Sequence, residues 1–282
     1  MATDLSPEYL KQIQFPHYPF LHCLIKLRRP IAAIRSMQRL MTPGLRTAPQ
    51  SVVLSSQKDL IAPTLEEERF HFQTKRWAFI ENIFDEEFHQ TLITHWPKRK
   101  FLVPPKNILK AYDIGLEWER GQSKEIPHLH YHPALKGFFE YLCSPSFGRR
   151  ITDFSGAERE LSCYSFLTTT TYPGSLVPPH KDGYYYYPEA RGTLNILFFV
   201  DGTGGPHSGG LTLIHDNTFT DVIFEPDQLK NTALIYDVCA PFFHGFRPVA
   251  RGKFRWAIST LFCPTEYSKK KQENPLAQRK NR

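Results

Sequence analysis

Short runs of β-branched and aromatic residues dominate the sequence between residues 161 and 263. Clusters of Gly, Pro or Asp separate these runs, which read LSCYSFLTTTTY, TLNILFFV, GGLTLIHD, DVIFEP, TALIYDV and FRWAISTLFC. Strands of this length at short intervals are typical of an antiparallel sandwich or barrel, whereas βαβ units would place helical segments between them. The pattern therefore predicts a mainly β fold.

Helical periodicity appears earlier in the chain. In the segment WAFIENIFDEEFHQTLITHWP, a short strand is followed by Phe88, Leu92 and Trp96 at intervals of four residues. Asp85 precedes this stripe and suits the N-cap of a helix. A second helix is expected over PALKGFFEYLC, within a stretch from Phe101 to about Gly148 that is otherwise expected to be irregular and polar. These segments predict helices that flank the β-rich region.

The first part of the chain mixes apolar and basic residues. Ile31, Ile34, Met37 and Met41 recur at helical spacing, so this segment is expected to be partly helical. It could pack on the main domain or lie on a membrane or partner surface. We divide the chain into a basic, partly helical N-terminal extension (1–70), a main domain (71–263, core 161–263) and a basic C-terminal tail (264–282).

The net charge of +7 comes from the two ends of the 282-residue chain. Residues 1–60 contain eight Lys or Arg against three Asp or Glu, and the tail from Pro264 contains six against two. Such ends would be attracted to an anionic partner, although solvated termini that aid solubility explain them equally well. Basic and aromatic residues do not alternate as in a nucleic-acid platform, so no nucleic-acid partner is expected.

Five scattered cysteines without a CxxC pair indicate reduced thiols rather than a disulfide framework or a zinc site. The N-terminus carries acidic residues and no continuous apolar run, so it does not resemble a secretory signal. No stretch approaches the length of uncharged apolar residues that spans a bilayer. The expected location is cytoplasmic, with peripheral contact with the inner membrane face as an extension of that prediction.

The candidate chemistry centres on the stretch PPHKDGYYYYP. His180 and Asp182 lie two residues apart, and His244 follows 62 residues after Asp182, at the start of a predicted loop. Two imidazoles and one carboxylate on one face of a metal leave open positions that suit Fe(II) and dioxygen. Arg255, on the next predicted strand, would point inward with Ala257 and Ser259 and could hold a carboxylate.

Three blocks, TTYPGSLVPPHKD, TLNILFFVDGTGGPHSGGLTLI and HGFRPVARGKFRWAIST, resemble the core of the Fe(II)/2-oxoglutarate-dependent oxygenases, prolyl-4-hydroxylase-like branch. The resemblance implies a double-stranded β-helix (jelly-roll, cupin-like) core. It implies that His180, Asp182 and His244 ligate iron and that Arg255 binds the distal carboxylate of 2-oxoglutarate. Tyr172 would hydrogen-bond the same co-substrate, and Asn195 is a weaker candidate for that role.

The resemblance also implies the reaction. Such enzymes use Fe(II), 2-oxoglutarate and O2, with ascorbate as an optional reductant, to hydroxylate an unactivated C–H bond. Asp182 favours hydroxylation over chlorination, because related halogenases lack this carboxylate. The basic ends and tyrosines suit an anionic glycolipid or sugar at a membrane surface, such as a lipopolysaccharide core sugar. A protein side chain of the prolyl type, a small metabolite, or an inactive barrel that serves as a binding module are the alternatives.

Several other motifs have ordinary interpretations. His128, His130 and His132 could share one face of a strand and bind a metal, but read mostly as a polar loop. The segment DGTGGPHSGG lacks a following GK[ST] and is expected to be a wide hairpin turn rather than a phosphate cradle. A turn is also expected at His215-Asp216. The four tyrosines 184–187 could clamp a substrate or pack a flap.

Overall fold

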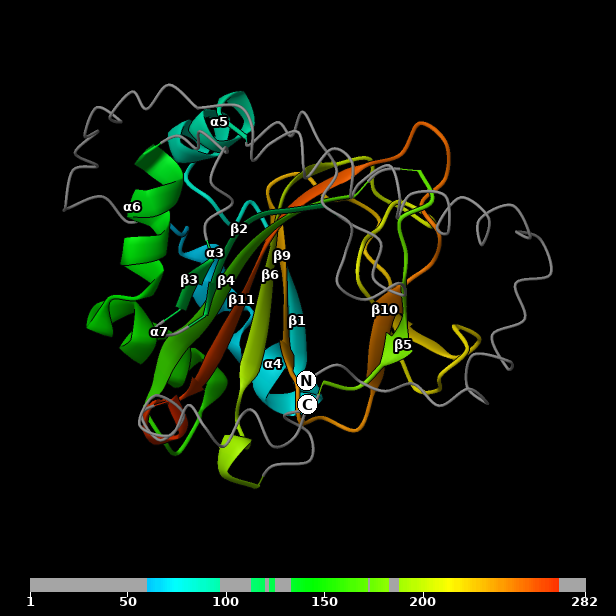
Figure 1. Cartoon of the computed structure of the whole chain (residues 1–282). Helices are drawn as coiled ribbons and strands as arrows, with labels where there is room; N and C mark the ends of the chain where they lie inside the picture. The colour runs from blue at the N-terminus through cyan, green and yellow to red at the C-terminus, as the bar shows by residue number, and fades with distance from the viewer. Residues whose placement is uncertain are drawn as a thin grey trace.

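A computed structural model describes residues 60–96, 113–119, 122–124, 133–171, 173–182 and 188–268, with the backbone alone for the second and third ranges. The described strands form two antiparallel sheets that face each other (Figure 1). The larger sheet has the order β1 (Trp77–Glu81), β9 (Thr232–Asp237), β6 (Leu194–Gly202), β11 (Arg255–Pro264), β4 (Leu161–Thr171), β2 (Asp113–Glu119) and β3 (Gln122–Lys124). The smaller sheet has the order β5 (Val177–His180), β10 (Phe243–Phe246), β7 (Thr212–Ile214) and β8 (Val222–Phe224).

The strand order defines a jelly roll. From β4 to β11 the chain passes repeatedly from one sheet to the other, so that β4, β6, β9 and β11 belong to the larger sheet and β5, β7, β8 and β10 to the smaller one. Eight strands arranged in two sheets in this way form a double-stranded β-helix. The predicted mainly β fold with this core is confirmed.

Two apolar cores result from the alternation of side chains along the larger sheet. One face packs against helices through Ile196, Phe198 and Ile258 among others. The opposite face, which we call the inner face, looks toward the smaller sheet and carries Leu197, Phe199 and Ala257 among others. In β11, Ala257 and Leu261 pack in the inner core, and Arg255 and Ser259 alternate with them, which agrees with the prediction for Arg255, Ala257 and Ser259. Side chains that face the smaller sheet can therefore reach a site between the sheets.

Helices cover the outer face of the larger sheet (Figure 1). α5 (Glu86–Thr94) begins at Asp85, whose carboxylate accepts a hydrogen bond from the amide of Phe88, as predicted. α6 (Pro133–Leu142) also lies where the sequence indicates a helix. α3 (Thr64–Glu67) and α4 (Arg69–Lys75) bury Leu65 and Phe72 in the outer core. The boundary drawn after residue 70 thus falls inside α4.

Three local predictions are wrong. His244 lies within strand β10 instead of at the start of a loop. The DGTGGPHSGG segment is not a hairpin, because it carries the chain from β6 in one sheet to β7 in the other. The stretch expected to stay irregular up to residue 148 already contains the first turn of α7 (Pro145–Ser155), which Ser144 caps and Gly156 ends in a left-handed conformation.

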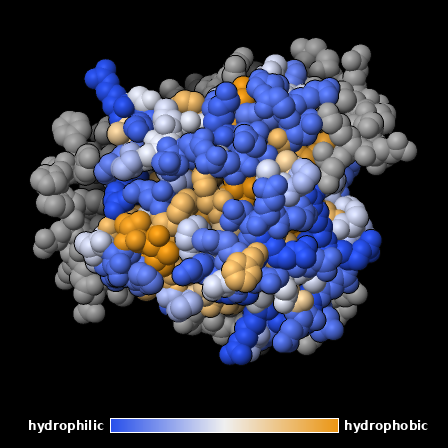
Figure 2. All heavy atoms as spheres, turned by 180° about the vertical axis from the view of Figure 1, so that it is seen from behind, coloured by the Kyte–Doolittle hydropathy of each residue, from blue (hydrophilic) through white to orange (hydrophobic). Residues whose placement is uncertain are grey.

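The surface is largely hydrophilic on the side seen in Figure 2, with small apolar areas between the polar ones. Among the described residues, the exposed large hydrophobic side chains are Phe70 and Val222. The part of the chain that the structure describes contains no helix that is both long and apolar enough to cross a membrane.

Candidate metal centre

The pairing of β5 with β10 brings two histidines together. His180 and His244 are direct partners across these antiparallel strands, and their ring centroids lie 4.3 Å apart. Directly opposed residues point to the same side of a sheet. Gly245 permits the close approach, because a Cβ there would lie 2.6 Å from the carbonyl oxygen of Val177. The structure thus joins residues that stand 64 positions apart in the sequence.

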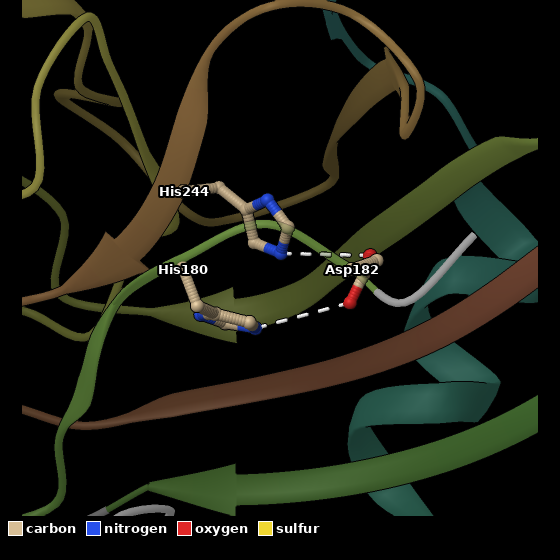
Figure 3. Close-up of side chains that lie close together, drawn as sticks. All are labelled: His180, Asp182 and His244. Atoms are coloured by element: carbon tan, nitrogen blue, oxygen red, sulfur yellow. Dashed lines mark ion pairs between the residues drawn. The ribbon is translucent and has the colours of Figure 1, made fainter. Parts of the chain in front are cut away.

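Asp182 completes the group from the segment that follows β5. Its Oδ1 lies 3.8 Å from Nε2 of His180, and its Oδ2 lies 3.5 Å from Nε2 of His244. The three side chains point toward one another (Figure 3). One ligand atom from each residue lies within 4.8 Å of the others. Ligands bonded to one ion in a facial arrangement lie roughly 3 Å apart, so small side-chain rotations would bring all three onto a metal.

The hydrogen bonding of His180 fixes which nitrogen is presented to a metal. Its Nδ1 lies 2.9 Å from the carbonyl oxygen of Pro178, which can only accept, so Nδ1–H is the donor. The lone pair is then on Nε2, the atom that faces Asp182. A backbone carbonyl that orients a histidine in this way is a common feature of metal sites. The donor set, two imidazole nitrogens and one carboxylate, fits Fe(II).

Arg255 lies deep between the two sheets. It is 2% exposed, and its Nη1 donates a 2.6 Å hydrogen bond to the carbonyl oxygen of Gly209. Its Nη2 lies 3.4 Å from the hydroxyl of Thr169, and the guanidinium carbon lies 4.8 Å from the ring centroid of Phe246 in β10. Strands of both sheets and the Gly-rich segment thus surround a buried cation suited to binding a carboxylate.

A hydroxyl beside this arginine has no hydrogen-bond partner among the described residues. Thr171 is the direct partner of Arg255 across β4 and β11, and its side chain is fully buried. Its Oγ1 is not hydrogen-bonded, although buried polar atoms usually are. A Cβ on Gly209 would lie only 2.8 Å from this oxygen, so the glycine leaves room beside it. An unsatisfied buried hydroxyl next to Arg255 is a feature that a bound carboxylate would explain.

A third polar group lies farther along the inner face. Asn195 Nδ2 donates a 2.9 Å hydrogen bond to the hydroxyl of Tyr236, and Ser259 Oγ donates a 3.3 Å hydrogen bond to Asn195 Oδ1. The Tyr236 ring contacts the His244 ring, with centroids 4.9 Å apart. Asn195 is therefore connected to the metal centre through Tyr236 rather than to Arg255.

Of the remaining residues considered in the sequence, some lie outside the described part of the chain and others lie in turns or ion pairs away from the metal centre. Tyr172, the tyrosines 184–187 and the histidines of IPHLHYHP lie outside the described residues. The turn expected at His215-Asp216 is present, because Asp216 accepts hydrogen bonds from the hydroxyls of Thr218 and Thr220, which hold its pKa far below the usual value. Arg247, which is close to His244 in sequence, forms an ion pair with Glu225, in which Nη1 and Oε1 lie 2.9 Å apart.

Sequence reasoning missed Thr169, Thr171, Gly209 and Tyr236. The threonines stand in a run of four, and their alternation with Arg255 across the sheet could have indicated two of them on the inner face. Gly209 contributes a backbone carbonyl, which leaves no residue-type signal. Tyr236 is part of an apolar strand, TALIYD, whose burial masks its polar end.

Comparison with known proteins gives similarity at the level of solved structures. A Pseudomonas putida prolyl-4-hydroxylase is 14% identical with a TM-score of 0.48, covering 71% of this chain and 98% of that one. A Trichoplax adhaerens prolyl hydroxylase in complex with a hypoxia-inducible-factor peptide is 14% identical with a TM-score of 0.49, covering 73% and 89%. A Burkholderia pseudomallei protein of the 2OG-Fe(II) oxygenase family is 13% identical with a TM-score of 0.46, covering 77% and 96%.

Neither a family model nor a curated protein matches the sequence. The chain is thus similar in structure to 2OG-Fe(II) oxygenases at low sequence identity. Its fold is defined by its own strand order, and its candidate metal centre by His180, Asp182 and His244.

Proposed function

We propose that this protein is an Fe(II)- and 2-oxoglutarate-dependent dioxygenase that hydroxylates an unactivated C–H bond. The observation that carries the proposal is the convergence of His180, Asp182 and His244 on one point between the sheets of a double-stranded β-helix. Arg255, buried between the same sheets, adds the cation that a dicarboxylate co-substrate requires. The chemistry that iron supplies in such a site is the activation of dioxygen, which oxidises 2-oxoglutarate to succinate and CO2 and delivers one oxygen atom to the substrate.

The residues of the chain bind and orient. His180, Asp182 and His244 would hold the iron through three positions on one side and leave the others open. Arg255 would hold the distal carboxylate of 2-oxoglutarate with its planar fork, and the hydroxyls of Thr169 and Thr171 lie beside it to accept or donate further hydrogen bonds. Because Arg255, Thr169 and Thr171 are at most 3% exposed, a carboxylate bound beside them would be shielded from water.

Visible absorption of the metal-free, anaerobic protein during addition of Fe(II) and 2-oxoglutarate tests the proposal. A weak charge-transfer band that requires both additions is expected. His180→Ala should abolish the band and Arg255→Ala should weaken it. His215→Ala and Arg251→Ala are matched controls, because these exposed residues lie on turns outside the site, and both should keep the band. No band in the unchanged protein would favour an inactive barrel that serves as a binding module.

The proposed substrate is an anionic glycolipid or its sugar at a membrane surface, with a prolyl-type side chain or a small metabolite as alternatives. The support is the excess of Lys and Arg in residues 1–60 and in the tail from residue 264. Such segments gain roughly 1 kcal/mol per basic residue near an anionic surface. We further propose that the enzyme is cytoplasmic, with its basic ends in peripheral contact with the inner membrane face.

Co-sedimentation with anionic vesicles at low salt, with and without residues 1–60, tests the membrane contact. Binding by the full chain that falls on truncation and at higher salt is expected, because the attraction is screened. A full chain that ignores the vesicles would remove this part of the proposal. Succinate release in the presence of candidate substrates then separates sugars, peptides and metabolites.

A further inference from the structure

The inner face of the larger sheet carries a second polar site, at the end opposite Arg255. Ser259 follows Arg255 by four positions on β11, which corresponds to roughly 13 Å along a strand. Asn195 on β6 pairs directly with Tyr236 on β9, and Asn195 and Ser259 are half-buried where Arg255 is enclosed. A five-carbon dicarboxylate held at Arg255 is too short to occupy both ends. That co-substrate would therefore leave the Asn195 end to another molecule.

The hydrogen bonds of Asn195 leave a defined pair of groups unused. Its amide lies between two hydroxyls: that of Tyr236 accepts from the amide nitrogen, and that of Ser259 donates to the amide oxygen. An amide has two N–H groups and two acceptor lone pairs. Whichever way the amide is turned between the two hydroxyls, one N–H and one carbonyl lone pair have no partner in the part of the chain that the structure describes. Asn195, which is half-buried, thus keeps one donor and one acceptor for a ligand.

The chemistry of this pair selects its ligand. A hydroxyl group can accept from the N–H and donate to the lone pair at the same time. A carboxylate can only accept, so it would leave the free lone pair of the amide without a donor. The two side chains that are hydrogen-bonded to this amide, Tyr236 and Ser259, carry hydroxyls and no charge. The pair therefore suits an uncharged hydroxyl-bearing group.

Tyr236 connects this site to the metal centre. Its hydroxyl is hydrogen-bonded to Asn195, and its ring contacts the ring of His244 with centroids 4.9 Å apart. A molecule bound at Asn195 would thus lie within one side chain of a metal ligand. Groups held this close fix which part of a substrate faces the reacting centre.

We propose that Asn195 and Ser259, held in place by Tyr236, form a subsite for a hydroxyl group on an uncharged ring of the primary substrate, such as a sugar ring. The proposal rests on the proposed function, because it makes this subsite the neighbour of a catalytic metal. It gives Asn195 a role in substrate selection instead of the co-substrate contact predicted from the sequence. Any negative charge of the substrate would lie away from this ring.

Saturation-transfer NMR of the full-length protein loaded with Zn(II) and 2-oxoglutarate tests the subsite without turnover. The probes are methyl glucoside, methyl mannoside and methyl galactoside, the corresponding methyl uronates, and N-acetylprolinamide, each at millimolar concentration. We expect at least one neutral glycoside to bind more tightly than its uronate and than the peptide amide. Asn195→Asp, which loses the N–H but keeps the shape, should weaken that glycoside roughly three- to tenfold, as should Ser259→Ala.

Two controls separate the possible failures. Ser146→Ala removes an exposed hydroxyl on α7 and should leave glycoside binding unchanged. The charge-transfer band with Fe(II) and 2-oxoglutarate should persist in Asn195→Asp. A band without binding of any neutral glycoside, tighter binding of a uronate or of N-acetylprolinamide, or equal glycoside binding by Asn195→Asp would each overturn the subsite. Loss of the band in the unchanged protein would instead overturn the proposed function.

Discussion

The two ends of the inner face belong to the same sheet but differ in exposure and charge. At one end Arg255, Thr169 and Thr171 are 2%, 3% and 0% exposed, and the group carries a cation. At the other end Asn195 and Ser259 are half-buried and uncharged. Low exposure strengthens electrostatic binding but restricts the ligand to one that fits. Under the proposed function, the enclosed end would bind the charged co-substrate and the more open end would bind a neutral group of the substrate.

The largest expected effect comes from the candidate metal ligands, of which His244 contacts Tyr236 at the Asn195 end. His180→Ala removes one of three donors, and we expect the affinity for Fe(II) to fall by two orders of magnitude or more, roughly 3 kcal/mol. Isothermal titration under anaerobic conditions measures this directly. If His180→Ala binds Fe(II) as tightly as His215→Ala does, the metal does not lie between His180 and His244. Neither end of the inner face would then be a neighbour of the metal.

Arg255 gives the next largest effect, and it should be confined to the enclosed end. Arg255→Ala removes charge-assisted hydrogen bonds worth about 1.5–3 kcal/mol each, so we expect 2-oxoglutarate to bind roughly a hundredfold more weakly. Fe(II) affinity and glycoside binding should change little. Arg255→Lys keeps the charge but lacks the planar fork, so its affinity for 2-oxoglutarate should lie between those of the unchanged protein and Arg255→Ala. Equal losses at both ends would mean that the arginine supports the fold as a whole.

Gly209 tests whether the enclosed end depends on backbone shape. It has φ +87°, and a Cβ would lie 2.8 Å from Thr171 Oγ1. Gly209→Ala should therefore destabilise the protein by about 2 kcal/mol, through backbone strain and the contact with Thr171. Gly252→Ala is the matched control, because Gly252 has φ +80° with nothing within 4 Å of the added methyl. Chemical unfolding measures both, and equal losses would show that the space beside Thr171 is unimportant.

Thr171→Val should separate stability from co-substrate binding. Valine has nearly the same shape and removes the unsatisfied hydroxyl, so the free energy of unfolding of the ligand-free protein should stay the same or rise by about 1 kcal/mol. The affinity for 2-oxoglutarate should instead fall severalfold, because the carboxylate loses a neighbour that can donate. A variant that binds 2-oxoglutarate normally would show that Thr171 does not contact the co-substrate.

The parts of the fold that carry a clear periodic or capping pattern in the sequence could be predicted, and the others could not. The long apolar strands and the capped helix α5 follow from periodicity and from Asp85. Strand β5 was not predicted, because Pro178 and Pro179 lack the N–H that a strand normally offers. The strand forms at the edge of the smaller sheet, where proline is tolerated. His244 lies in a four-residue strand too short to show alternation.

In the site, too, some groups could be predicted from the sequence and others could not. The residues that bear obvious chemistry, His180, Asp182, His244 and Arg255, were predicted, and the structure brings the first three together. The crossing between sheets after β6 could not be distinguished from a hairpin, because glycine-rich turns of both kinds look alike in sequence. As a result, the carbonyl of Gly209 beside Arg255 could not be foreseen.

The smallest expected effect sharpens the comparison at the open end. Tyr236→Phe and Ser259→Ala each remove one hydroxyl that holds Asn195, and each should destabilise the protein by about 1 kcal/mol. Because both act on the same amide, their effects should not be additive, and a double-mutant cycle should give an interaction energy of about 0.5 kcal/mol or more. Thr171→Val combined with Ser259→Ala is the control pair, since these residues contact opposite ends. Additive effects in both pairs would mean that Asn195 is not held between the two hydroxyls, and the open end would then have no fixed donor and acceptor to select a substrate.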